Sequence, residues 1–219
     1  MGACIKIFDW KKESLTMALG RDSTSYEILE AALDACSPGP YLSAEIGIRE
    51  GGSAEMIINK IADRQLGYTH IGIDHYGQMP QVHSDTNTMV LDYTNSMRNR
   101  AIAALYTLAE EKGVNFLFQN MQDGEFFKRF PEGVPIYNNS EARVVGWYGF
   151  VFLDGPHSTE LVLKETEFFA PRCVIGATMV FDDTPNFDMG PSINCLKQLG
   201  FEELVHGANK MSFIRREPA

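Results

Sequence analysis

The strongest constraint on the fold of this chain is a strand–helix–strand unit with a glycine-rich first turn, within residues 41–74. Residues 41–48 are a mostly apolar run typical of a buried strand, and residues 54–65 repeat apolar side chains at helical spacing. A second buried strand is indicated at residues 70–74. Two such strands pair in parallel through a right-handed crossover, so this unit predicts a doubly wound α/β sheet.

The rest of the chain continues this alternation of strands and helices. Further helices are expected at 25–36, 91–112, 123–130, 157–170 and 192–199, and further strands at 114–119, 144–153, 173–181, 201–205 and 211–215. The last two strands flank turn residues and form a hairpin, which adds one antiparallel strand. The sequence therefore predicts a single α/β domain over residues 1–219, with a mostly parallel sheet of about seven strands.

Two segments are expected to lie outside this regular pattern. Residues 1–40 are predicted as an N-terminal extension that caps the domain with a helix. Residues 75–90 are polar and irregular, which is typical of an inserted loop. Loops on a rigid scaffold often shape binding pockets, so both segments are candidates for shaping the substrate pocket.

The overall composition is that of an ordinary globular protein with an acidic balance. The 219 residues are 44% hydrophobic and 22% charged, and the formal net charge is −10. Nucleic-acid-binding proteins usually carry a basic face that contacts phosphates, and no extended basic run is visible here. We therefore expect no DNA or RNA partner. We also expect no membrane span, because no apolar stretch reaches the required length.

The cysteines and the first residues favour a reducing, cytoplasmic compartment. Cys4, Cys36, Cys173 and Cys195 form no Cys-x-x-Cys pair and no zinc-knuckle spacing. The opening segment has no charged leader followed by an apolar core, so no secretory signal is predicted. The oligomeric state stays open, with a homo-oligomer among the alternatives.

Acidic residues lie near the ends of five successive predicted strands. They are Glu45, Asp74, Asp123, Asp154 and the pair Asp182-Asp183. Ligands of open α/β sheets bind outside the carboxyl ends of the strands. The sequence therefore predicts one ligand crevice at this edge of the sheet.

The first turn and the second strand end indicate a nucleoside ligand. Residues 45–53 read Glu-x-Gly-x-x-x-Gly-Gly-Ser, where glycine lets the backbone approach a ligand and the next helix offers free N–H groups. Asp74 can accept hydrogen bonds from both hydroxyls of a ribose. Two alternatives stay open. The glycines of this turn serve only its tight geometry, or Asp74 is only a solvated acid at the end of a strand.

These motifs and two later stretches resemble the class I methyltransferases that use S-adenosylmethionine (SAM). The later stretches are Phe150-Val151-Phe152-Leu153-Asp154-Gly155-Pro156-His157-Ser158 and Met179-Val180-Phe181-Asp182-Asp183-Thr184. The resemblance runs from about residue 41 to the C-terminus and is closest to the magnesium-dependent small-molecule O-methyltransferases of the catechol and macrolide-sugar type. It implies a Rossmann-like fold, SAM as methyl donor and a sugar or secondary-metabolite hydroxyl as acceptor.

The resemblance also implies a role for individual residues at the SAM end of the crevice. Glu45, Gly47, Gly51 and Ser53 match the motif that holds the amino-acid end of SAM. Asp74 matches the acid that binds the ribose, and His75 beside it is a further candidate contact. Asp123 falls where the family contacts adenine, and Asp154 is a further candidate for SAM binding.

At the other end of the crevice the resemblance implies a metal and a base. Asp154, Asp182 and Asp183 match the ligands of the magnesium-dependent members, and Mg²⁺ prefers such oxygen ligands. His157 falls at the position of the general base. A bound cation lowers the pKa of an acceptor hydroxyl, and His157 can then take the proton near neutral pH. On this hypothesis a chelator abolishes activity.

Other interpretations of these residues remain open. Asp182 to Thr184 can cap the next helix, and His157 can open the helix after Asp154. A non-catalytic or metal-independent SAM-binding protein of the same fold is one rival. An NAD-dependent oxidoreductase is another, although its Gly-x-Gly-x-x-Gly signature is absent. His70, His75, His83 and His206 show no metal-ligand spacing.

Overall fold

A computed structural model describes residues 19, 23–137 and 142–216 of the chain. The main sheet has seven strands in the order β10-β11-β9-β8-β1-β2-β5. Its strands are β1 (Leu42–Ile46), β2 (Thr69–Asp74), β5 (Asn115–Asn120), β8 (Tyr148–Leu153), β9 (Cys173–Phe181), β10 (Phe201–His206) and β11 (Met211–Arg215). The helices are α1 (Tyr26–Ala35), α2 (Gly52–Asp63), α3 (Asn95–Lys112), α4 (Asp123–Arg129), α5 (Thr159–Phe169) and α6 (Gly190–Gln198).

The pairing within this sheet confirms the predicted fold class. Strands β5, β2, β1, β8 and β9 pair in parallel. Strand β11 pairs antiparallel with both β9 and β10, so the C-terminal hairpin supplies the one antiparallel strand of this sheet. The parallel strands therefore share one carboxyl edge, where the acidic residues were expected to meet.

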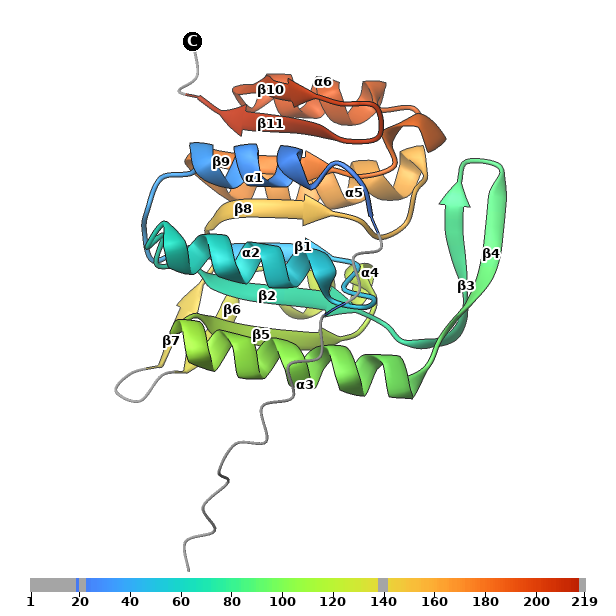
Figure 1. Ribbon diagram of the computed structural model, residues 1–219. Helices are drawn as coiled ribbons and strands as arrows, with labels where there is room; N and C mark the ends of the chain where they lie inside the picture. Colours follow the sequence, from blue (N-terminus) through green and yellow to red (C-terminus); the bar gives the residue numbers. More distant parts are fainter. Residues whose placement is uncertain (1–18, 20–22, 138–141, 217–219) are drawn as a thin grey trace, which may run out of the picture.

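Helices cover both faces of the sheet, as Figure 1 shows: α1, α2 and α3 lie on one face and α4, α5 and α6 on the other. Every residue of β1, β2 and β8 is buried. Strands covered on both sides read as continuous apolar runs, which is why they were predictable from the sequence. Among the described helices, none combines the length and apolar character that a membrane-spanning helix needs.

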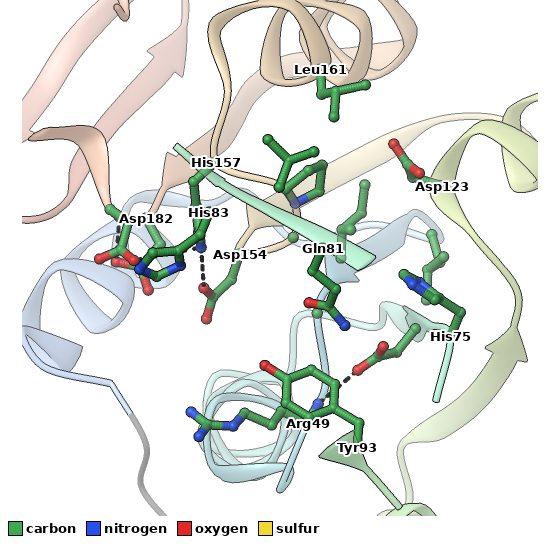
Figure 2. A pocket seen from close by; sticks show the side chains of 18 of the residues that line it. Arg49, His75, Gln81, His83, Tyr93, Asp123, Asp154, His157, Leu161 and Asp182 are labelled. Atoms are coloured by element: carbon green, nitrogen blue, oxygen red, sulfur yellow. Dashed lines mark hydrogen bonds and ion pairs between the residues drawn. The ribbon is translucent and has the colours of Figure 1, made fainter. Parts of the chain in front are cut away.

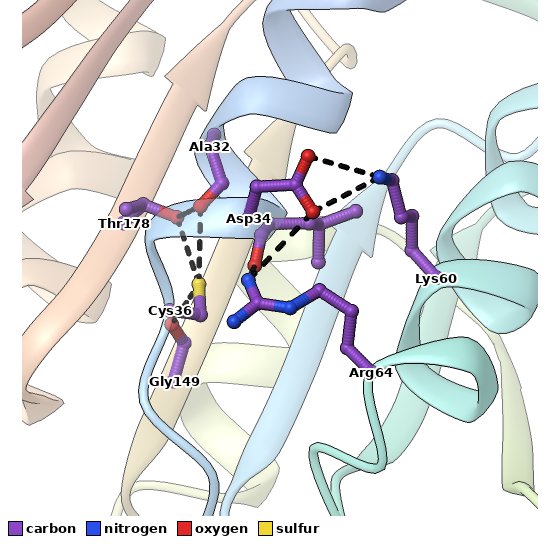
Figure 3. A network of polar contacts seen from close by, with 8 residues as sticks. Ala32, Asp34, Cys36, Lys60, Arg64, Gly149 and Thr178 are labelled. Atoms are coloured by element: carbon purple, nitrogen blue, oxygen red, sulfur yellow. Dashed lines mark hydrogen bonds and ion pairs between the residues drawn. The ribbon is translucent and has the colours of Figure 1, made fainter.

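Helix α1 belongs to the packed core, although it lies in the segment expected as an extension. It buries Ile28, Leu29, Ala32 and Leu33. Its C-terminal end is tied down by Cys36, whose Sγ lies 3.2 Å from the carbonyl oxygen of Gly149 and 3.2 Å from Oγ1 of Thr178 (Figure 3). Burial raises the pKa of the Cys36 thiol, so this cysteine has a structural role. The expectations for residues 1–18 and 20–22 lie outside the described residues.

Helix α1 is also tied to α2 on the same face of the sheet. Asp34 accepts hydrogen bonds from Nζ of Lys60 at 2.9 and 3.0 Å, and Nη1 of Arg64 donates to the carbonyl oxygen of Leu33 at 2.7 Å (Figure 3). Because α1 is held to both α2 and the sheet, this helix is part of the domain.

The segment expected as an inserted loop is a two-stranded antiparallel hairpin, β3 (Gly77–Ser84) and β4 (Asn87–Tyr93). It projects from the carboxyl edge of the main sheet, at the right of Figure 1. Large apolar side chains on it stay exposed, including Met79 and Met89. A strand pair without a covered face carries no clear alternation of apolar and polar residues, so the sequence did not predict it.

The strand expected at residues 144–153 is divided into two. Residues Ala142–Val145 form β7, which pairs with β6 (Val134–Tyr137) in a separate hairpin, and β8 begins at Tyr148. Gly146 lies at the break, where an added Cβ atom would lie 2.8 Å from the carbonyl oxygen of Glu132. This close backbone approach separates the two strands, and a glycine within an apolar run is its sequence signal.

Candidate functional site

A cavity of about 670 Å³ opens between the carboxyl edge of the sheet and the β3–β4 hairpin. Five acids from four strand ends line it: Asp74, Asp123, Asp154, Asp182 and Asp183. The hairpin contributes Gln81, Val82, His83, Met89 and Tyr93 from the opposite side (Figure 2). The volume lies within the range of about 300–1,000 Å³ usual for small-molecule sites. The structure therefore brings the predicted acids together, apart from Glu45.

The loop after β1 forms one wall of the cavity and depends on glycine. Gly47 has φ +90°, and a Cβ atom there would collide with the backbone carbonyl of Asp154. Gly51 has φ +88° and is the N-cap of α2, but it does not line the cavity. Only glycine adopts this conformation at Gly47 and also allows β1 and β8 to end side by side.

Asp74 holds this loop in place from the end of β2. Its Oδ2 accepts hydrogen bonds from the backbone N–H groups of Ile48 at 2.9 Å and Arg49 at 2.8 Å. Burial raises the pKa of Asp74, and these two hydrogen bonds oppose the rise. Asp74 thus fixes the glycine turn while its carboxylate faces the cavity.

Glu45 and Ser53 lie behind the cavity wall, not among its lining residues. Both are buried, and the Ser53 hydroxyl donates a very short hydrogen bond to Oε1 of Glu45. Nε2 of His70 lies 3.3 Å from Oε2 of Glu45, and Nδ1 of His70 lies 3.1 Å from the Ser43 hydroxyl. These contacts tie β1 to α2 and β2, and the expected contact of Glu45 and Ser53 with SAM stays a prediction.

His75 and Asp123 line the cavity at the end nearest β2 (Figure 2). Nε2 of His75 is shielded from solvent and has no hydrogen-bond partner in the described part of the chain. Behind Asp123 lies Glu165 of α5, which is fully buried. Burial, with Asp123 adding to it, raises the pKa of Glu165 well above its usual range. A glutamate on the apolar face of a predicted helix was the sequence signal for this residue, and it was missed.

Asp154, Asp182 and Asp183 meet at the other end of the cavity, but Asp182 already has a cationic partner. Nζ of Lys210, which is 1% exposed, lies 2.6 Å from Oδ1 of Asp182. The Ser23 hydroxyl donates to Oδ2 of Asp182 at 2.9 Å and accepts a hydrogen bond from Lys210. Burial raises the pKa of Asp154 well above its usual range; Asp182 adds to the rise and Lys210 opposes it.

This arrangement does not fit the magnesium site predicted from Asp154, Asp182 and Asp183. Mg²⁺ needs carboxylate oxygens that are free to bind it, whereas both oxygens of Asp182 are engaged by Lys210 and Ser23. The Lys210 ammonium supplies the positive charge that we expected from a bound ion. Lys210 was missed because it lies in a turn-rich segment between the last two strands.

His157 lies between the acids and the hairpin. Its Nε2 is 3.5 Å from Oδ2 of Asp183 and 4.0 Å from Oδ1 of Asp154. Its backbone N–H donates to the carbonyl oxygen of Val82 in the hairpin at 3.0 Å. Burial lowers the pKa of His157, while Asp183 opposes that shift. A neutral imidazole beside a carboxylate is an arrangement that can accept a proton.

His83 of the hairpin approaches the same point from the opposite side (Figure 2). The rings of His83 and His157 lie edge to face with centroids 5.8 Å apart. His83, His157 and Asp183 each offer one ligand atom, and these atoms lie within 4.8 Å of one another. No sequence pattern pointed to His83, because the hairpin that positions it has the composition of a loop.

Comparisons with known proteins identify a family and a fold. The model of a family described as a methyltransferase domain matches residues 44–184. A search of curated proteins gave no match. Similar solved structures include CalS11, a TDP-rhamnose 3'-O-methyltransferase, at 12% identity and a TM-score of 0.52, covering 88% of this chain and 76% of that chain.

Two further structures share the fold. The O-methyltransferase NovP has a TM-score of 0.55 at 13% identity, covering 87% of this chain and 79% of that chain. The 16S rRNA N2 G1207 methyltransferase RsmC of T. thermophilus has a TM-score of 0.52 at 13% identity, covering 92% of this chain and 45% of that chain.

Proposed function

The chain belongs to the methyltransferase-domain family, whose model spans residues 44–184, and from this premise we propose that it transfers the methyl group of SAM to a hydroxyl of a small molecule. The observation that carries the proposal is the cavity at the carboxyl edge of the sheet. It has nucleoside-compatible groups at one end and a histidine paired with carboxylates at the other.

The end of the cavity at β2 fits the nucleoside of SAM. Asp74 faces the cavity with a carboxylate that can accept hydrogen bonds from ribose hydroxyls. Asp123 and the unpartnered Nε2 of His75 lie beside it and would face adenine. Gly47, whose missing side chain leaves the backbone open, would face the amino-acid end. SAM supplies a methyl group that is already electrophilic, so this chain has mainly to bind and orient.

His157 is the proposed proton acceptor for the methyl-accepting hydroxyl. The proton would pass from the hydroxyl oxygen to Nε2 of His157, which leaves an oxygen nucleophile facing the methyl group. Asp183, 3.5 Å from this nitrogen, would stabilise the imidazolium that forms. General-base catalysis of this kind is worth about 10²–10⁴-fold in rate.

The reaction is proposed to proceed without magnesium. The Lys210 ammonium balances the charge of Asp182, which relieves the repulsion that would otherwise favour a bound cation. A reaction without magnesium corresponds to the metal-independent alternative that the sequence left open.

A small molecule is favoured over a nucleic acid as acceptor. The hairpin lies against the mouth of the cavity, and its Val82 contacts the backbone of His157. The net charge of −10 opposes contact with phosphates. Like CalS11, which acts on TDP-rhamnose, this chain is proposed to methylate a sugar or secondary-metabolite hydroxyl.

A methyl-transfer assay tests this proposal. The protein is incubated with SAM labelled in its methyl group and with pools of glycosides, nucleotide sugars and phenols, in the presence of a chelator. Label is expected in a small-molecule pool. His157→Ala is expected to lower turnover by about 10²–10⁴-fold and to leave SAM affinity unchanged. The exposed His206→Ala serves as the matched control. Turnover that stops in chelator, or label that enters only RNA, contradicts the proposal.

A further inference from the structure

We propose that His83, His157 and Asp183 form a binding site for a divalent transition-metal ion such as Zn²⁺ or Co²⁺. The three residues come from the hairpin, the loop after β8 and the loop after β9, so the fold brings them together from distant parts of the chain. This site shares Asp183 with the predicted magnesium site but differs from it, because it uses two imidazoles and leaves out Asp182.

The distances between the ligand atoms suit one ion. Zn²⁺ binds imidazole nitrogen and carboxylate oxygen at about 2.0–2.2 Å, which places the ligand atoms of one ion roughly 3–4 Å apart. Nε2 of His157 and Oδ2 of Asp183 are 3.5 Å apart. The ligand atom of His83 is within 4.8 Å of both, and the His83 side chain is exposed, so it has room to rotate toward the other two.

The chemistry of the three ligands selects the class of ion. Two nitrogen ligands and one carboxylate favour Zn²⁺, Co²⁺, Ni²⁺ or Fe²⁺ over Mg²⁺, which prefers oxygen. Oδ1 of Asp154 lies 4.0 Å from Nε2 of His157, so a second carboxyl group lies beside the site. Because the ion pair of Lys210 is with Asp182, the carboxylate of Asp183 stays available to balance a divalent cation.

Hydrogen bonds at the tip of the hairpin hold His83 in place. Oδ1 of Asp85 accepts from the backbone N–H of Thr159 at 2.7 Å, and Oδ2 accepts from the Thr159 hydroxyl at 2.7 Å. The Val82 carbonyl accepts from the backbone N–H of His157 at 3.0 Å. Contacts on both sides of His83 thus hold the hairpin in place. This positions the His83 side chain opposite His157.

A bound ion would affect the proposed methyl transfer, and this part of the inference rests on that proposed function. A metal bound at Nε2 of His157 uses the lone pair that would accept the proton of the acceptor hydroxyl. The ion and the proton therefore compete for one nitrogen, and Zn²⁺ is expected to inhibit methyl transfer.

Titration with Co²⁺ tests the site directly, because the visible absorption of cobalt reports nitrogen and oxygen ligands. We expect the full chain to bind one equivalent of Co²⁺ and Zn²⁺ to displace it. His83→Gln is expected to weaken binding by more than tenfold, and Asp183→Asn to weaken it as well. His206→Gln, a matched change at an exposed histidine, is expected to bind as the unmodified chain does. Unchanged cobalt binding in His83→Gln, or no visible band in the unmodified chain, overturns the site.

Measuring methyl transfer at the same Zn²⁺ concentrations separates the site from the function. Binding with inhibition that is lost in His83→Gln supports both. Binding without inhibition supports the site and removes His157 as proton acceptor. Methyl transfer without any metal binding overturns the site and leaves the proposed function standing.

Discussion

Lys210 shows how one buried charge decides the chemistry around it. Its ammonium lies 2.6 Å from Asp182 and 5.7 Å from the ring centre of Phe152, and the side chain is 1% exposed. Lysine is almost never buried unless it is paired. The ion pair between Lys210 and Asp182 therefore stabilises the carboxyl edge of the sheet only while both side chains are present.

Replacing Lys210 by methionine removes the positive charge and keeps most of the side-chain volume. The carboxylate of Asp182 then stays buried without a cation, so we expect the free energy of unfolding to fall by about 3–5 kcal/mol. Unfolding in urea measures this loss. Adding Asp182→Asn to the Lys210→Met variant is expected to restore much of it. A double variant as unstable as the single one contradicts the pairing.

Glu165 gives a second test at the residue scale, through the pH dependence of stability. Its pKa in the folded protein is raised well above 4.5 by burial, so the folded chain binds a proton that the unfolded chain releases. Its contribution to stability is therefore fully present below about pH 4.5 and is lost as pH rises toward the folded-state pKa.

Glu165→Gln removes this proton linkage. We expect the variant to lose less stability than the unmodified chain between about pH 5 and pH 8, and to be the more stable of the two at the upper end. Thermal unfolding across this range provides the measurement. Glu167→Gln, on the exposed face of the same helix, is the control. Parallel pH profiles for Glu165→Gln and the unmodified chain would show that Glu165 is ionised.

Among the elements, the β3–β4 hairpin has the largest effect on the site. It contributes His83 and closes one side of the cavity, yet it has few buried side chains of its own. Its position depends on Asp85, whose two oxygens hold the start of α5. Hydrogen exchange of its backbone amides measures how stably the hairpin is held.

Asp85→Ala is expected to loosen the hairpin without unfolding the domain. Because two hydrogen bonds to Thr159 are lost, backbone amides of β3 and β4 should exchange severalfold faster. Exchange in β1 and β2 should stay the same. Mass spectrometry of exchanged peptides measures both. Equal acceleration in the main sheet would show that Asp85 supports the whole fold.

The elements also show which parts of the fold the sequence could predict. Strands β1, β2 and β8 are buried along their whole length, so their apolar runs predicted them. The hairpin lacks such a face, and its contact between Asp85 and Thr159 joins residues 74 positions apart. A sequence pattern carries no record of a contact at that separation.

For the whole molecule, parallel topology is what collects the site. Each parallel strand ends at the same edge, so acids placed after strands meet without any specific contact between them. That rule predicted the convergence of Asp74, Asp123, Asp154, Asp182 and Asp183. It could not predict Lys210 or Ser23, because neither residue follows the carboxyl end of a parallel strand.

The central claim is that this cavity binds SAM with the ribose at Asp74. Isothermal titration of SAM into the unmodified chain, Asp74→Ala and the control Asp34→Ala tests it most directly. We predict binding to the unmodified chain and to Asp34→Ala, whose acid lies on α1 in an exposed ion pair. We predict binding about 10- to 100-fold weaker in Asp74→Ala, because hydrogen bonds to a charged acceptor are lost. Equal SAM affinity in all three proteins, or no SAM binding by the unmodified chain, would contradict the account.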